Sequence, residues 1–104
     1  MYKIVLSFTF CVFCAISAFS QEHVIDQLGR KFIPAQIKVK VGDTLRFTNS
    51  DPFAHNAYTD DVLNEFDTGM QSTGKSAVVP IKAKGTFNVN CMIHPEMILK
   101  VTVD

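Results

Sequence analysis

The sequence lacks any surplus of charge of one sign. It contains 10 lysine and arginine residues and 10 aspartate and glutamate residues, with a formal net charge of +0 at pH 7. Domains that bind nucleic acid usually carry a clustered basic excess, so that class of function is not expected. The chain also lacks internal repeats, low-complexity tracts and an evident linker. At 104 residues it is too short for a second core, and we expect one small domain.

Long apolar runs are absent except at the N-terminus. Met1-Tyr2-Lys3 precedes an apolar run from Ile4 to Phe19, and Ala18-Phe19-Ser20 has the small-x-small pattern of a cleavage site. We expect residues 1–20 to be a signal peptide cleaved after Ser20. Residues 21–104 would then form a periplasmic or otherwise exported domain with no membrane attachment. The alternative is an uncleaved membrane anchor.

Cysteine is scarce, and two of the three cysteines lie in the predicted signal peptide. Cys11-x-x-Cys14 has the spacing of a redox or zinc motif, but its position in an apolar signal run argues against that interpretation. Cys91 is then the single cysteine of the exported domain. It cannot form an intramolecular disulfide. A bound metal ion would instead hold it as a protected thiolate.

Period-two alternation of apolar and polar residues predicts short strands. A turn is expected at Gly29-Arg30, and residues 53–59 can be extended. The clearest predicted strands are residues 23–27, 36–41, 44–48, 76–81, 86–91 and 99–104. No segment has a convincing long helical pattern. The sequence therefore predicts an all-β antiparallel sandwich or barrel of about seven to eight strands.

The segment 60–74 is less regular. We expect a loop or a short helical turn there, pinned by its apolar residues Leu63, Phe66 and Met70. Five acids lie between positions 51 and 67, namely Asp51, Asp60, Asp61, Glu65 and Asp67. They predict a solvated face, with a docking patch for a basic partner as the alternative.

Three soft or borderline metal donors lie within seven residues near the C-terminus. Cys91, His94 and Met97 are each three positions apart, and the phase of the preceding strand turns Cys91 inward. A fourth ligand must come from His23 or His55. We choose His55 because it follows a turn cluster after a strand. Two histidines, a thiolate and a thioether are the donor set of blue-copper sites.

Other interpretations of these residues have less support. Methionine is a poor zinc ligand, which argues against structural zinc. A Cys-His hydrolase would need an orienting group and an oxyanion hole, and no motif indicates either. Isolated histidines and methionines are usually structural, and Met70 and Met92 are left as core or loop residues.

The motif Cys91-x-x-His94-Pro95-x-Met97 resembles the ligand loop of the cupredoxin, or blue copper, family. Its spacing is closest to the short-loop amicyanin and plastocyanin-like type. The resemblance covers residues 24–104. Further matching segments are Val39-Lys40-Val41-Gly42-Asp43-Thr44, Leu45-Arg46-Phe47-Thr48-Asn49, His55-Asn56 and Gly85-Thr86-Phe87.

The resemblance implies a Greek-key β-sandwich or barrel that holds one mononuclear type 1 copper. His55, Cys91 and His94 would be the strong ligands, and Met97 the axial one. Asn56 would hydrogen-bond near the thiolate or tie the two ligand loops together, and Pro95 would stiffen the ligand loop.

Electrons would leave through the ring edge of His94, framed by Phe53, Ile93 and Pro95. The resemblance thus implies a non-enzymatic carrier, with no catalytic residue, that shuttles single electrons in the periplasm. Its partners would be a c-type cytochrome, an amine dehydrogenase or an oxidase, and a monomer is expected. The alternative is a periplasmic protein that binds and delivers copper. An enzyme with an open copper site would require that Met97 does not bind.

Overall fold

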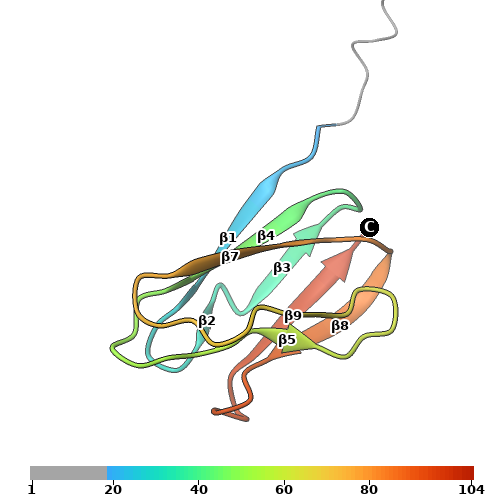
Figure 1. Cartoon of the computed structure of the whole chain (residues 1–104). Helices are drawn as coiled ribbons and strands as arrows, with labels where there is room; N and C mark the ends of the chain where they lie inside the picture. The colour runs from blue at the N-terminus through green and yellow to red at the C-terminus, as the bar shows by residue number, and fades with distance from the viewer. Residues whose placement is uncertain (1–18) are drawn as a thin grey trace, which may run out of the picture.

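The computed structural model describes residues 19–104, which form nine strands in two sheets (Figure 1). The predicted signal peptide therefore lies almost wholly outside the described residues. In the described part, no helix is long and apolar enough to cross a membrane. The strands are β1 Glu22–Gln27, β2 Phe32–Ile33, β3 Gln36–Val39, β4 Thr44–Asn49, β5 Tyr58–Thr59, β6 Phe66–Asp67, β7 Ser76–Pro80, β8 Gly85–Asn90 and β9 Ile98–Val103.

The strand order is β2-β1-β4-β7 in one sheet and β3-β9-β8-β5-β6 in the other. This arrangement confirms the predicted all-β sandwich. The expectation of purely antiparallel pairing is wrong, because β1 pairs with β4 and β3 pairs with β9 in parallel. The chain passes to the second sheet for β3 before it returns as β4, so β1 and β4 are not joined by a hairpin. Alternation within a strand predicts its two faces but carries no information about the direction of its neighbour.

The core lies between the sheets, and alternation along each strand fills it. In β4, Leu45 and Phe47 are fully buried, while the alternate residues Thr44, Arg46 and Thr48 are only partly covered. Phe47 contacts Phe32 in an edge-on ring arrangement at a centroid distance of 6.0 Å. In β8 and β9, the inward residues alternate in the same way. Both sheets therefore present an apolar inner face, and this face extends to the loops at one end of the sandwich.

The segment 60–74 is held largely by buried polar residues. Of the three apolar residues predicted to pin it, only Phe66 packs against the core, and the prediction is wrong for Leu63 and Met70. Leu63 and Met70 are 62% and 57% exposed. Asn64 is buried instead, and its Oδ1 accepts hydrogen bonds from the backbone N–H groups of Lys82 at 2.8 Å and Ala83 at 3.0 Å. Because two backbone N–H groups find their acceptor there, an amide stabilises this loop better than an apolar side chain would.

The five acids do not share one solvated face. Asp51 is buried, with 3% exposure, whereas Asp60, Glu65 and Asp67 are exposed. The sequence prediction is therefore wrong for Asp51, whose carboxylate contacts two backbone N–H groups of the β1–β2 turn and the ring of His55.

Candidate metal centre

Strand β8 places Cys91 at the end of the apolar inner face. Phe87 and Val89 point inward with 6% and 0% exposure, and Cys91 follows in the same phase with 2% exposure. The prediction that alternation turns this side chain inward is confirmed. Cys91 is a free thiol at the point where the strand stops and a loop begins.

The loop between β8 and β9 lies at the end of the sandwich opposite the C-terminus (Figure 1). The backbone N–H of Met97 donates to the carbonyl oxygen of His94 at 2.9 Å, which closes a four-residue turn. Pro95 occupies the second position of this turn, where its fixed φ angle is favourable. The turn brings His94 back toward Cys91 and directs Met97, with 1% exposure, into the core.

His55 comes from the loop after β4 and is fully buried. Its backbone is held by a two-way bridge to Gln71, with N–H to carbonyl distances of 3.1 and 2.7 Å. Its ring Nε2 lies 2.6 Å from Oδ2 of Asp51. The remaining ring nitrogen, Nδ1, faces Cys91, and this nitrogen is the one free to bind a metal ion.

The three strong donors of the prediction come together in space. The Sγ atom of Cys91 lies 3.8 Å from Nδ1 of His55 and 3.9 Å from Nδ1 of His94. The ligand atoms of all three residues lie within 4.8 Å of one another. A sulfur at about 2.3 Å and an imidazole nitrogen at about 2.0 Å from one ion lie roughly 3.7 Å apart at an angle of about 120°. The observed distances therefore suit a single metal ion between the three side chains.

The other candidate histidine lies apart from this cluster. The Nε2 atom of His23 is 2.9 Å from Oδ2 of Asp43, at the beginning of β1. Met97 packs in the same buried core cluster as Cys91, with its side chain away from solvent. Its burial keeps the thioether away from solvent, and its ligation to a metal ion stays a prediction.

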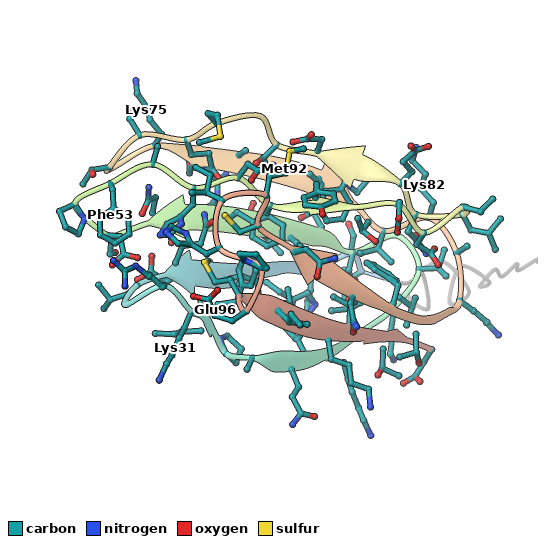
Figure 2. The ribbon with its side chains drawn as sticks, turned by 90° about the horizontal axis from the view of Figure 1, so that it is seen from below. Lys31, Phe53, Lys75, Lys82, Met92 and Glu96 are labelled. Atoms are coloured by element: carbon teal, nitrogen blue, oxygen red, sulfur yellow. The ribbon has the colours of Figure 1, made fainter. Side chains whose placement is uncertain are left out.

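Phe53 packs against the partly exposed ring of His94, and exposed apolar residues precede this histidine in the chain. The ring of Phe53 lies 5.7 Å from that of His94 and 5.3 Å from that of His55, between centroids. Phe53, Ile93 and Met92 are 37%, 51% and 67% exposed. Figure 2 shows Phe53 at the extreme of this end of the molecule and Lys82 toward the other. Met92 was not predicted to belong here, because nothing in its spacing separates it from a core methionine.

Asn56 joins the two ligand-bearing segments. Its Oδ1 accepts a hydrogen bond from the backbone N–H of Met92 at 2.8 Å, and the side chain is buried. The bond fixes the start of the β8–β9 loop to the residue that follows His55. Of the two roles that the resemblance implied for Asn56, this contact corresponds to tying the two ligand loops together. Pro95 lies in the turn closed by Met97.

A set of buried polar residues behind His55 was missed by the sequence analysis. Asn49 donates from Nδ2 to the carbonyl oxygens of Phe53 at 3.0 Å and Gln71 at 2.9 Å. Asp51 accepts from Nε2 of His55. Burial acts to raise the pKa of Asp51, but hydrogen bonds from the backbone of Arg30, from the ring of His55 and from the backbone of Gly29 together hold it below its usual range. Residues 49–52 have the composition of an ordinary turn, which predicts solvated side chains. Only the four-residue spacing from Asp51 to His55 indicates that the carboxylate could reach the histidine.

Comparison with known families gives a match over the whole described domain. The family of copper binding proteins, plastocyanin/azurin family, matches residues 20–104. The prediction of a cupredoxin resemblance is thereby confirmed.

Individual relatives agree with this match. The chain is 31% identical over 86 residues to a chloroplastic plastocyanin of Fritillaria agrestis, with 70% of this chain and 52% of that protein covered. It is 27% identical over 82 residues to a plastocyanin of Ulva arasakii, with 69% and 83% covered. Thus the chain spans about half the length of the first relative. Among solved structures, a mutant of amicyanin in its reduced form gives a TM-score of 0.74 at 25% identity, covering 86% of this chain and 89% of that one.

Proposed function

Because the chain belongs to the copper-binding plastocyanin/azurin family, we propose that it is a small type 1 copper protein that carries single electrons between redox partners. The observation that carries this proposal is the cluster of Cys91, His55 and His94, whose donor atoms lie within 4.8 Å of one another. One thiolate and two imidazoles are the donors of the trigonal plane in blue-copper sites. Bound copper would supply the one-electron redox couple.

The protein's contribution is a rigid and dry frame for these donors. Cys91 is held at the end of β8, His55 by its backbone bridge to Gln71, and His94 by the turn closed at Met97. Donors that cannot move far keep the same arrangement in both oxidation states, which lowers the reorganisation needed for electron transfer. We propose Met97 as the weak axial ligand, since its side chain is buried and its backbone N–H closes the turn that carries His94.

We propose the partly exposed ring of His94 as the path for the electron. Phe53, Ile93 and Pro95 would surround it, together with the exposed Met92. A rim in which apolar side chains predominate allows close approach of a partner, and it suits a short-lived complex. With four protein ligands, no coordination position would remain for a substrate, so we assign no catalytic residue.

The cellular setting is part of the proposal. An exported, periplasmic monomer would meet a c-type cytochrome, an amine dehydrogenase or an oxidase as donor or acceptor. Cleavage of residues 1–20 would release the domain from its leader. Mass spectrometry of the exported protein tests the cleavage, and a mature N-terminus at Gln21 is expected.

Visible spectroscopy of the copper-loaded protein tests the proposed function. An intense thiolate-to-copper band and reversible one-electron cycling are expected from the wild type. Cys91→Ser should abolish the band while the fold is retained, because Cys91 is a free thiol and forms no cross-link. A protein that stays colourless with Cu(II) and binds only Cu(I) would overturn the carrier in favour of copper delivery.

A further inference from the structure

The hairpin turn between β1 and β2 has an unusual backbone. Gly29 and Arg30 have φ angles of 68° and 59°, and the N–H of Leu28 donates to the carbonyl oxygen of Lys31 at 3.1 Å. Left-handed conformations at both central positions are typical of a tight two-residue hairpin turn. Glycine adopts this conformation readily, whereas a long side chain such as arginine does so rarely. Some other interaction must therefore stabilise the turn.

That interaction is the carboxylate of Asp51. The N–H of Gly29 donates to its Oδ1 at 2.6 Å, and the N–H of Arg30 donates to its Oδ2 at 3.0 Å. Consecutive N–H groups in such a turn form a small concave site for an anion. Asp51 fills this site, so the turn and the carboxylate hold each other in place.

The same carboxylate supports the ligand His55. Oδ2 of Asp51 lies 2.6 Å from Nε2 of His55, and the two side chains are 4% and 0% exposed. The backbone of Asp51 is fixed as well, since its N–H donates to Asn49 Oδ1 at 2.9 Å and its carbonyl oxygen accepts from Thr73 Oγ1 at 2.6 Å. The carboxylate cannot turn away from the ring without losing bonds to the hairpin.

The contact with the carboxylate determines which ring nitrogen of His55 carries the hydrogen. An ionised carboxylate only accepts hydrogen bonds, so Nε2 of His55 must carry the hydrogen. The lone pair is then on Nδ1, the atom that lies 3.8 Å from Cys91 Sγ. A carboxylate behind a metal-binding histidine fixes the ring orientation and makes the ring a stronger donor.

We propose that the Gly29–Arg30 turn and Asp51 form a positioning unit for His55 that favours Cu(II) over Cu(I) and thereby lowers the reduction potential. This inference rests on the proposed copper site. The turn orients the carboxylate, and the carboxylate fixes the tautomer and plane of the ring. Loss of such support typically lowers metal affinity about 10- to 100-fold. A tenfold loss confined to Cu(II) corresponds to a rise in potential of about 59 mV.

Asp51→Asn tests the carboxylate, and Asp43→Asn is its matched control. Asp43 also accepts two backbone N–H bonds and contacts a histidine, but that histidine lies outside the metal cluster. Asp51→Asn should weaken Cu(II) binding, raise the reduction potential and shift the thiolate-to-copper band. In the metal-free protein, the slowly exchanging Nε2 proton of His55 should lose its strong downfield NMR signal. Asp43→Asn should change none of these.

Gly29→Val tests the turn without touching either the carboxylate or the ring. Gly42→Val is the control, since Gly42 also has a positive φ, of 97°, and a Cβ at either glycine meets nothing within 4 Å. Both variants strain the backbone and should lower the melting temperature. Only Gly29→Val should also raise the potential, in the same direction as Asp51→Asn.

The outcomes separate this inference from the proposed function. A wild-type protein without a thiolate-to-copper band would refute the carrier, and the NMR signal of the metal-free protein would still report the tautomer of His55. A normal wild-type band, with the potential and the His55 signal unchanged in Asp51→Asn and Gly29→Val, would overturn the positioning unit alone. Equal shifts in the controls would also overturn it, because a general loss of stability would then explain the effect.

Discussion

The molecule contains two buried carboxylates that are built almost alike, one at each end of β4. Asp43 accepts hydrogen bonds from the backbone N–H groups of Gln21 at 3.0 Å and Lys40 at 2.9 Å, and it lies 2.9 Å from the ring of His23. Asp51 accepts two backbone N–H bonds from the β1–β2 turn and lies 2.6 Å from the ring of His55. Each carboxylate joins a turn, a neighbouring strand and a histidine.

The two pairs differ in the surroundings of the imidazole nitrogen that does not contact the carboxylate. The side chain of His23 is 18% exposed, and it stands outside the metal cluster. The side chain of His55 is fully buried, and its second nitrogen faces a thiol and another imidazole. The same carboxylate-histidine pair therefore ties down the start of β1 in one place and supports a metal ligand in the other. What the second ring nitrogen faces decides the function.

Replacement of each histidine in turn by glutamine gives the largest expected difference in copper binding. His55→Gln should reduce copper affinity by orders of magnitude and abolish the thiolate-to-copper band, because one of three strong donors is lost. His23→Gln should leave both properties at the wild-type level. Isothermal titration with copper and visible spectra of both variants measure the contrast. Equal copper binding by the two variants would refute the ligand assignment of His55.

Two of the three buried asparagines, Asn56 and Asn64, extend the comparison to the loops. Asn64→Ala leaves the backbone N–H groups of Lys82 and Ala83 without their acceptor, at the end far from the metal cluster. We expect a loss of unfolding free energy of about 2–3 kcal/mol with an unchanged copper spectrum. Asn56→Ala leaves one N–H, that of Met92, without its acceptor. It should cost about 1–2 kcal/mol and alter the spectrum. Urea unfolding and visible spectra check both, and an altered spectrum in Asn64→Ala would contradict the separation of the two ends.

The sequence was informative wherever a pattern had one physical explanation. Alternation in 86–91 predicted the burial of Cys91, and the three-residue spacing to His94 predicted that a tight loop could bring the two together. Pairing direction could not be predicted, because a strand's faces do not depend on it. Asp51 and Asn64 could not be identified either, since aspartate and asparagine in turns are usually solvated. Their burial depends on which backbone N–H groups the rest of the fold leaves without partners.

The pH dependence of stability tests the structural role of the Asp43 carboxylate. Hydrogen bonds from the backbone of Gln21, from the His23 ring and from the backbone of Lys40 lower the pKa of Asp43 to about 2. A depressed pKa means that the folded state prefers the ionised form, so this stability is present above about pH 4 and is lost as the pH falls toward 2. The change should be about 2 kcal/mol. Urea titrations of wild type and Asp43→Asn between these values test it, and an equal pH dependence in both proteins would contradict it.

Arg30→Gly gives the smallest expected effect and separates the backbone of the β1–β2 turn from its side chain. Glycine adopts a φ angle of 59° without strain and keeps the N–H that donates to Asp51. The guanidinium, whose Cζ lies 5.4 Å from the centroid of the Phe53 ring, is lost. Relief of strain at a left-handed residue is worth about 1 kcal/mol or more. Loss of the contact with Phe53 costs about 0.5–1 kcal/mol, and the greater backbone freedom of glycine in the unfolded chain costs about 0.5–1 kcal/mol, so the terms oppose one another and stability should change little. The reduction potential should remain that of the wild type, because the bond to the carboxylate remains. A potential shifted as far as in Asp51→Asn would mean that the cation, and not the turn, acts on the copper site.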